Sequence, residues 1–468
     1  MKSISASIVC LLVFVLSSVV YSGGIYSGGS GIAGDPYRIS TAADLDDIGN
    51  HTDDYAKCFI LTNDVDMTGY SYTAAVIAPD TDNTSWTFQG TRFTGTFDGN
   101  GFAVYNLTVD GSGSYYTGLF GSVSGGLLKN LAVINCSVSG KDYVGAVAGS
   151  NGNSGGIVNC ESSGEIGGVS YLGGIAGENT ASASIQNCRS SCTMSGSGNS
   201  YMVGGLVGDN SYSATVVDCC SSGRVNGSSN VGGLAGRSHS ASIARCYSTG
   251  AVSGSTGVGG LVGVCSSSIE NCYSNGDVSG VYNIGGFVGN NSSGSVSDCY
   301  SSGHVTGGAT YSEVGGFCGY QYGSASVMSN CFWDVDTSGM TVGYYQNPSP
   351  LYSGTVTNVV GKTDEQMRIE STFTDAGWDF VDEEDNGTDG IWQIESDGAD
   401  YPRFWWQLLS MVNLSGSLGV DELDIAFFGY RWLFEDCDLD DDCQGADIDG
   451  SGKVDLVDWC CLAENWLK

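Results

Sequence analysis

Small apolar residues and glycines form a block that recurs along the middle of the chain. The sequence Val-Gly-Gly-Leu-Val-Gly occupies residues 203–208 and 258–263, and close copies occupy residues 231–236 and 284–289. Weaker copies stand at 118–121, 144–149, 172–177 and 314–319, so successive blocks lie 26 to 31 residues apart. A period of this size, held over eight units, is the sequence signature of a solenoid.

The remainder of each unit also favours strands. Gly-x-Val runs such as residues 223–225 and 250–252 follow the block, and Ser, Gly and Asn separate the runs. Three such runs per unit predict three strands and three turns, and no apolar stripe of period 3.6 supports a helix. We therefore predict a mainly β fold, a parallel and right-handed β-helix solenoid of about eight coils over residues 118–335.

One cysteine follows each block, usually directly after Asn or Asp. The residue after the cysteine varies and the next is mostly Ser, as in Tyr247-Ser248, so alternation directs both the cysteine and the Ser inward. The Ile three positions earlier, such as Ile243, should also point inward, which alternation alone forbids. A bend at the intervening Asn or Asp resolves the conflict, because both tolerate left-handed backbone. We predict an Asn/Asp corner column beside a buried cysteine column, formed by Asn135-Cys136, Asn159-Cys160, Asn187-Cys188, Asp218-Cys219, Arg245-Cys246, Asn271-Cys272, Asp298-Cys299 and Asn330-Cys331.

These repeats resemble the GLUG motif family. The Gly-Leu-x-Gly core of that family is matched by residues 205–208 and 260–263, and residues 271–274 (Asn-Cys-Tyr-Ser) resemble the sequence that surrounds it. The resemblance covers roughly residues 118–335. It implies a bacterial β-helical protein that is secreted or surface-exposed, often adhesin-like and sometimes carried as an accessory region of a protease. The family motif includes no catalytic residue.

Both ends of the predicted rod need a cap, because an open coil would expose its strand edges. Residues 36–117 are expected to form the N-terminal cap and first irregular coils, with a short helix at 42–49. Residues 98–101 (Asp-Gly-Asn-Gly) are interpreted as a turn rather than an enzyme loop. Residues 336–408 are expected to form an aromatic C-terminal cap that closes the last coil, with a sugar platform as the alternative.

The start of the chain and the charge distribution indicate an extracellular protein. Residues 1–22 combine Lys2, an apolar run and a small-residue cleavage site, which predicts a secretory leader followed by a tether at 23–35. The chain has 468 residues and a net charge of −35, and 27 of its 51 acidic residues lie in 361–468. Such a surface disfavours nucleic acid and anionic membranes as partners. No membrane span is expected after the leader is removed.

The cysteine count leaves two arrangements open. Removal of a leader containing Cys10 leaves 17 of the 18 cysteines, and an odd number in a secreted chain means that at least one is unpaired. Stacked cysteines of adjacent coils would have Cα atoms about 4.8 Å apart, within disulfide range. The column is therefore either a file of reduced thiols, the arrangement we favour, or a series of bridges between coils.

The C-terminal 60 or so residues contain a calcium-binding pattern. Residues 447–458 match an EF-hand loop, in which carboxylate, hydroxyl and carbonyl oxygens meet the six to eight ligands that Ca²⁺ prefers. The following helix has an apolar face. The predicted ligands are Asp447, Asp449, Ser451, Lys453 through its carbonyl, Asp455 and Asp458.

A weaker copy of this loop lies 34 residues upstream, and only two carboxylates remain at its ligand positions. We expect little or no calcium there. Cys437 and Cys443, between the two loops, are close enough to form a disulfide. The positions of the degenerate loop are Asn413, Ser415, Ser417, Gly419, Asp421 and Asp424.

Two loop–helix repeats over residues 410–468 resemble a dockerin module. The resemblance rests on Asp447, Asp449, Asp455 and Asp458 and on the degenerate upstream set. It implies a module that folds on calcium and docks into a cohesin-like domain of a scaffold or cell surface. The departure of the first loop from the pattern weakens the two-site symmetry that this family shows.

The sequence leaves two functions from different classes open. The first is a non-catalytic rod, secreted or at the cell surface, adhesin-like or polysaccharide-binding, and attached through the calcium module. An exposed column of Tyr247, Tyr273 and Tyr300 would give such a rod a stacking surface. The alternative is a lyase or glycoside hydrolase acting within a polysaccharide catabolic complex. Glycosidases need two nearby carboxylates, and Glu161 and Glu165 are the candidates considered, without a convincing partner.

Overall fold

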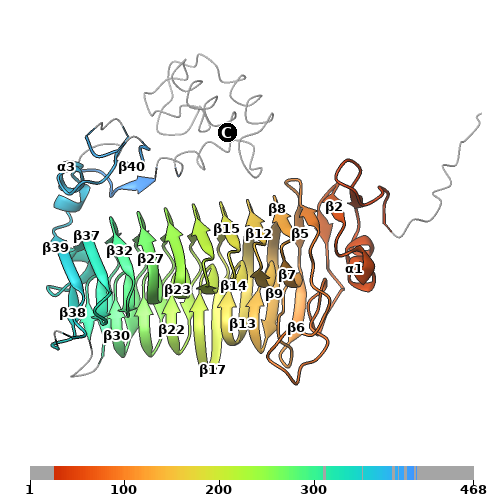
Figure 1. The fold of residues 1–468 in the computed structure, drawn as a ribbon, viewed down its shortest axis with the longest axis horizontal. Coiled ribbons are helices and arrows are strands. Elements are labelled where there is room, and N and C mark those ends of the chain that lie inside the picture. Colours follow the sequence, from red (N-terminus) through yellow and green to blue (C-terminus); the bar gives the residue numbers. More distant parts are fainter. Residues whose placement is uncertain are drawn as a thin grey trace, which may run out of the picture.

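The chain folds into a parallel β-solenoid of about nine turns. The structure is a computed structural model that describes residues 26–308, 313–349, 351–381, 385–387, 389–394, 398–404 and 407. Within these residues, 39 strands form one continuous sheet in which all the interstrand pairings are parallel, and three α-helices accompany it. Figure 1 shows the coils stacked along one axis, from β2 at one end to β39 at the other. The predicted mainly β, parallel fold is confirmed.

A short helix covers the first coil, as the sequence predicts. Thr41 and Asp44 cap its N-terminus with reciprocal hydrogen bonds, and Leu45 and Ile48 are buried against the first strands. The N-terminal elements are β1 (Tyr37–Ile39), α1 (Ala42–Asn50), a 3-10 turn η1 (Thr52–Asp54), β2 (Cys58–Leu61), β3 (Val65–Asp66), β4 (Thr96–Asp98), β5 (Ala103–Tyr105) and β6 (Thr108–Gly111).

The regular coils contain four or five short strands rather than the predicted three. The coil that begins at β22 turns at Gly233 and Leu234 before β23 starts, so the glycine block is itself a bend. The elements are β7 (Phe120–Ser124), β8 (Leu127–Lys129), β9 (Ala132–Gly140), β10 (Asp142–Gly145), β11 (Ala148–Gly152), β12 (Gly156–Val158), β13 (Glu161–Gly173), β14 (Ala176–Asn179), β15 (Ser184–Gln186), β16 (Arg189–Ser190), β17 (Thr193–Gly204), β18 (Val207–Ser211), β19 (Thr215–Val217), β20 (Cys220–Ser221), β21 (Val225–Asn226), β22 (Ser229–Gly232), β23 (Ala235–Ala244), β24 (Tyr247–Ser248), β25 (Val252–Ser253), β26 (Thr256–Gly259), β27 (Val262–Glu270), β28 (Tyr273–Ser274), β29 (Val278–Gly280), β30 (Tyr282–Gly285), β31 (Val288–Asn291), β32 (Ser295–Ser297), β33 (Tyr300–Ser301) and β34 (Val305–Gly307).

Parallel pairing continues beyond the last strong repeat. β37 pairs with β39 through seven registered residue pairs, and an outlying two-stranded sheet, β40 with β41, follows. The C-terminal elements are β35 (Val314–Gly315), β36 (Cys318–Gln321), β37 (Val327–Asp334), α2 (Val335–Ser338), β38 (Tyr344–Gln346), β39 (Thr355–Lys362), η2 (Gln366–Arg368), α3 (Ser371–Thr374), β40 (Trp392–Gln393) and β41 (Arg403–Phe404).

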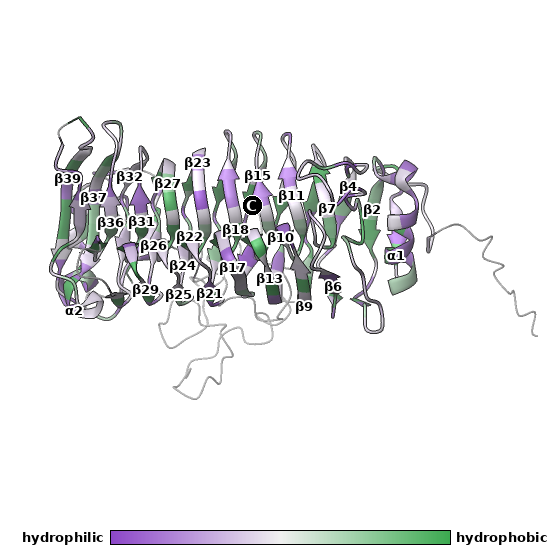
Figure 2. Cartoon of the chain, turned by 90° about the horizontal axis from the view of Figure 1, so that it is seen from below, coloured by the Kyte–Doolittle hydropathy of each residue, from purple (hydrophilic) through white to green (hydrophobic). Residues whose placement is uncertain are grey.

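Equivalent residues of successive coils stack in register and fill the core. The first Val of each block pairs with its counterpart in the next coil, and the rings of Phe287 and Phe317 stack with centroids 4.8 Å apart. In Figure 2, hydrophilic and hydrophobic residues alternate along the strands, as a sheet with one buried face requires. The Leu/Phe column is fully buried and consists of Leu206, Leu234, Leu261, Phe287 and Phe317.

The glycines of the block are required because neighbouring backbones touch there. A Cβ added to Gly233 would lie 2.1 Å from the carbonyl oxygen of Gly260 in the next coil and 2.8 Å from Oγ of Ser248. Ser248 donates its hydroxyl to the same carbonyl at 2.6 Å. The inward residues Ser248, Ser274 and Ser301 each bond to the glycine block across the core, and a side chain on Gly233 would displace Ser248.

The predicted Asn/Asp corner column is confirmed from Asn159 onward, but Asn130 and not the predicted Asn135 precedes Asn159 in it. Asn159, Asn187 and Asn271 have φ of 52°, 51° and 50°, the left-handed region that Asn tolerates better than most residues. Side chains along this corner bond from coil to coil: Nδ2 of Asn159 donates to Oδ1 of Asn130 at 3.1 Å. Where Arg245 occupies the corner, its Nε donates to Oδ1 of Asp218 at 2.6 Å.

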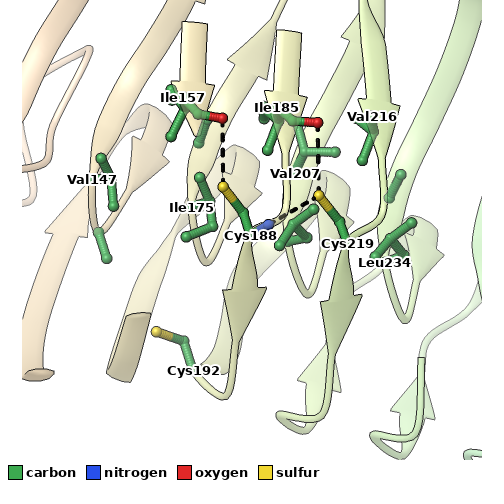
Figure 3. Packing of buried hydrophobic residues seen from close by; sticks show 14 of the residues in the cluster. Val147, Ile157, Ile175, Ile185, Cys188, Cys192, Val207, Val216, Cys219 and Leu234 are labelled. Atoms are coloured by element: carbon green, nitrogen blue, oxygen red, sulfur yellow. Dashed lines mark hydrogen bonds between the residues drawn. The ribbon is translucent and has the colours of Figure 1, made fainter. Parts of the chain in front are cut away.

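The cysteine column is buried and reduced, as favoured from the sequence (Figure 3). Each of the 13 cysteines within the described residues is unpaired. The backbone N–H of Cys188 lies 3.3 Å from Sγ of Cys219, and the contact recurs from coil to coil. The prediction was wrong for Cys136. Register places Leu131 beside Cys160, because Ala132 pairs with Glu161, and Cys136 lies further along β9.

A column of buried asparagines, whose side chains bond to one another from coil to coil, was not predicted from the sequence. Nδ2 of Asn151 donates to Oδ1 of Asn179 at 3.0 Å, and Nδ2 of Asn179 donates to Oδ1 of Asn210 at 2.9 Å. All three amides are fully buried and also donate to backbone carbonyls. A buried amide is stable only when it is hydrogen-bonded, so each coil supplies hydrogen-bond partners for the asparagine of its neighbour.

The expected exposed tyrosine column is wrong, because the C-terminal aromatics cover it. Tyr273 and Tyr300 are 4% and 1% exposed, although they point outward from the coils. The C-terminal aromatics also do not close the last coil as expected. They fold back along the flank, where the hydroxyl of Tyr300 donates to the carbonyl of Pro402 at 2.7 Å (Figure 1). The covering residues are Met367, Phe373, Trp378, Phe380, Trp392, Ile394 and Phe404, which we call the aromatic cover.

Replacement of one block glycine should destabilise the solenoid. In Gly233→Ala the added methyl group meets backbone of the next coil, which cannot move away without breaking the ladder. We expect a loss of about 1–3 kcal/mol in unfolding free energy, measured by urea denaturation. Gly113→Ala is the control, because nothing lies within 4 Å of its added Cβ. Equal stability of the two variants would contradict the packing described.

The buried cysteine column leads to a second prediction. Burial raises the pKa of the Cys160, Cys188 and Cys219 thiols, so these three stay protonated in the folded protein, and burial also keeps a reagent away from the column. Maleimide should modify few cysteines in the native chain and at least 13 after denaturation without reductant. Mass spectrometry counts the adducts. Fewer than 13 after denaturation would mean that some of these cysteines are bridged.

Candidate functional site

One column of the solenoid brings two carboxyl groups and two guanidinium groups into successive coils. Ser122, Ser150, Glu178, Asp209 and Arg237 pair in register across five coils, and each directly follows the last glycine of its block. Arg92 extends the column by one coil, since its neighbour Phe93 pairs with Val123. We call these six residues the polar column. In the following coils Val264, Asn290 and Tyr320 take the same position.

The polar column is internally bonded and electrically balanced. Nε of Arg92 donates to Oγ of Ser122 at 3.3 Å, and Oγ of Ser150 donates to Oε2 of Glu178 at 3.1 Å. At the other end, Nε and Nη2 of Arg237 donate to the two carboxylate oxygens of Asp209 at 2.7 and 2.9 Å. Such a bidentate pair fixes both side chains.

Glu178 is the titratable member of this column. Burial, followed by the negative charge of Asp209 in the next coil, raises the pKa of Glu178 from 4.5 to about 7. The hydroxyl of Ser150 and the arginines act in the opposite direction. Asp209 has a side chain only 2% exposed, whereas Glu178 is half-buried. The two adjacent carboxyl groups therefore differ: Glu178 exchanges a proton near neutrality, and Asp209 is enclosed by its guanidinium partner.

A stack of tyrosines runs beside the polar column. The rings of Tyr116 and Tyr143 lie 4.5 Å apart and those of Tyr143 and Tyr171 lie 4.4 Å apart, all at left-handed corners. We call these three residues the tyrosine ladder. Burial, followed by the charge of Glu178, raises the pKa of Tyr116 and of Tyr143, so their hydroxyls stay protonated. The ladder and Glu178 therefore share one environment.

A long loop, residues 78–92, closes one end of both features. It takes the place of the short connection between Phe120 and Val123 in the next coil. Phe88 meets Tyr116 edge-on at 5.3 Å, and the guanidinium of Arg92 lies 4.8 Å from the Phe88 ring centre. The hydroxyl of Tyr116 donates to the carbonyl of Trp86 at 2.9 Å, while the Trp86 side chain is 68% exposed.

The carboxylates considered from the sequence do not form a site. Glu161 pairs with Arg189 and Ala132, and Glu165 pairs with Thr193 and Ser137. Asp98 is the last residue of β4, beside the corner, where its carboxylate accepts from Nδ2 of Asn130 at 3.0 Å and forms an ion pair with Lys129 at 2.9 Å, which agrees with the turn interpretation. The Glu178–Asp209 pair was missed, although the residue after each block's last glycine, read down the repeats, identifies it.

The predicted calcium ligands, the degenerate loop and the Cys437–Cys443 bridge all lie in 408–468, outside the described residues. Within the described part of the chain, no group of three or more His, Cys, Asp or Glu residues is placed to hold a metal ion. Over the same residues, no helix is long and apolar enough to cross a membrane.

Comparison with known proteins supports the repeat assignment. The family profile described as "The GLUG motif" matches residues 227–253 and 280–306. The chain is 38% identical over 133 residues to halomucin of Haloquadratum walsbyi, which covers 27% of this chain and 1% of that protein. It is 31% identical over 163 residues to a candidate Gly-rich membrane protein of Evansella cellulosilytica, covering 33% of this chain and 18% of the relative. The chain thus spans a small part of either relative.

Among solved structures, the chain is similar to a candidate immunoglobulin A1 protease of Bacteroides ovatus. The sequences are 21% identical, the TM-score is 0.41, and the match covers 82% of this chain and 96% of the other.

The raised pKa of Glu178 predicts a pH dependence of stability. Between the unfolded pKa of 4.5 and the folded pKa of about 7, the folded state holds a proton that the unfolded state has released, so stability falls as pH rises. We expect the wild type to lose about 1–3 kcal/mol from pH 5 to pH 8 relative to Glu178→Gln. Urea denaturation of both proteins at the two pH values measures this difference. Parallel pH profiles would show that Glu178 titrates normally.

Proposed function

We propose that this protein is a non-catalytic β-helical rod, displayed outside the cell, that binds polysaccharide and is held by a calcium-dependent C-terminal module. The main observation in favour of a non-catalytic protein is that Asp209, one of the two adjacent carboxyl groups of the polar column, is enclosed. Both oxygens of Asp209 are occupied by Arg237, and its side chain is 2% exposed. A glycosidase needs a second carboxylate that reaches the substrate or a water molecule.

The extracellular location rests on the leader-like residues 1–22 and on the relatives. One relative is named halomucin and another a Gly-rich membrane protein, and the GLUG profile matches two repeats of this chain.

The attachment is proposed from the sequence of residues 410–468. Asp447, Asp449, Asp455 and Asp458, with Ser451 and the carbonyl of Lys453, would bind one Ca²⁺ and order a dockerin-like module for a cohesin-like partner. The described chain supports a tether on the side of the rod. Nε2 of Gln407 donates to the hydroxyl of Tyr273 at 2.5 Å, so the chain leaves the described region from the flank.

The second candidate is an enzyme of a polysaccharide catabolic complex. The observation that favours it is Glu178, a half-buried acid whose pKa of about 7 suits a general acid or base near neutrality. The enclosed state of Asp209 makes this the weaker of the two.

Calcium binding and partner capture test the proposal in the full mature chain. Calorimetric titration should show one Ca²⁺ site that is lost in Asp449→Ala and kept in Asp421→Ala, the matched change in the degenerate loop. Capture by a cohesin-bearing bacterial extract should require calcium and fail for Asp449→Ala. Calcium binding by both variants would contradict the assignment of the loop.

Sedimentation with insoluble polysaccharides tests the binding part. The chain should bind at least one of them equally with calcium or EDTA and release no reducing ends. Release of reducing ends that is abolished in Glu178→Gln would establish the enzyme instead.

A further inference from the structure

The loop at the end of the polar column presents an isolated aromatic ring to solvent. Trp86 is 68% exposed, whereas the other tryptophans within the described residues, Trp333, Trp378 and Trp392, are buried. Its position is fixed through its backbone, because the Trp86 carbonyl accepts the hydrogen bond of Tyr116. Tyr116 in turn stacks on Tyr143. A large ring exposed at the end of an ordered ladder offers an apolar face on which a sugar ring could stack.

From Trp86 a row of polar and aromatic residues leads along the rod axis, in which Tyr116 and Tyr143 are only 7% and 8% exposed and the later members are more accessible. The tyrosine ladder and Glu178 follow, and Arg237 ends the row four coils beyond Ser122, a span of about 19 Å at the usual strand spacing. Tyr171 and Glu178 are half-buried and the Arg237 side chain is 28% exposed, so all three remain within reach of a bound molecule.

The chemistry of this row fits a neutral ligand rich in hydroxyl groups. The guanidinium groups of Arg92 and Arg237 are accompanied by the carboxyl groups of Glu178 and Asp209, and Asp80 adds a third carboxyl group at the base of the loop, so the strip has no excess of positive charge that would hold an anion. Asp80, at the base of the loop and 6% exposed, has a buried carboxylate oxygen Oδ2 without a hydrogen-bond partner among the described residues. Because this oxygen has almost no accessible surface, its donor would be a buried water molecule and not the ligand itself.

We propose that the strip from Trp86 along the tyrosine ladder to Glu178 and Arg237 binds a neutral polysaccharide chain lying parallel to the rod axis. The inference rests on the polysaccharide-binding part of the proposed function and assigns it to one face. The Trp86 ring takes the apolar face of a sugar, and the charged and hydroxyl groups accept and donate along the following sugars.

The test uses the full mature chain and a panel of insoluble cellulose, xylan and mannan, with polygalacturonate as the charged comparison. Trp86→Ala should weaken sedimentation with the neutral polysaccharide about tenfold or more, the usual cost of losing a central aromatic anchor. Tyr171→Phe, which keeps the stacked ring and removes only the hydroxyl, should weaken it less. Tyr212→Ala is the control, because Tyr212 is 63% exposed and stands outside the strip.

The outcomes separate this inference from the proposed function. If Trp86→Ala and Tyr171→Phe bind as well as the wild type, the rod still binds polysaccharide, but the assignment of binding to this strip is wrong. Preference for polygalacturonate would overturn the neutral ligand. If the wild type binds none of the polysaccharides, both the proposed polysaccharide-binding function and the strip are wrong. If Trp86 is then required for capture of a protein, the partner of this surface is a protein and not a polysaccharide. Melting temperatures confirm that each variant is folded.

Discussion

The close approach of neighbouring backbones at the glycine blocks is the constraint on which the rest of the molecule depends. At Gly233 the space for a side chain is already filled by the next coil's carbonyl and by Ser248. This contact sets the register, and register brings like residues together in columns of Leu/Phe, Cys, Asn and Ser. A single coil cannot offset the entropy of ordering its own residues, so each column is stable only as part of the stack.

Most of the fold could be predicted because the same pattern of residues recurs in every coil. The period indicates the solenoid, and the conflict between Ile243 and Cys246 predicts the left-handed corner that Arg245 and its Asn/Asp counterparts occupy. Cys136 was misassigned because Asn130 and Leu131 occupy the equivalent corner and core positions without a cysteine. The outward direction of Tyr273 was predictable, but its burial was not. The aromatic cover lies about a hundred residues later in sequence and shares no period with the coils.

The candidate site was harder to find because it consists of departures from the repeat. Glu178, Asp209 and Arg237 lie about thirty residues apart and become neighbours only through register. The position after the last block glycine would have revealed the column, but the proton affinity of Glu178 and the enclosure of Asp209 depend on burial. The loop at 78–92 interrupts the period, and its contact with Tyr116 is a tertiary feature that no spacing in the sequence indicates.

The path of the chain from β39 back to Tyr273 has a mechanical consequence. Tension applied beyond Gln407 reaches the rod through the aromatic cover, which is seated on Tyr273, Tyr300 and Phe332 in three successive coils. The force therefore acts across several coils at once, in shear, instead of peeling the terminal strand away one hydrogen bond at a time.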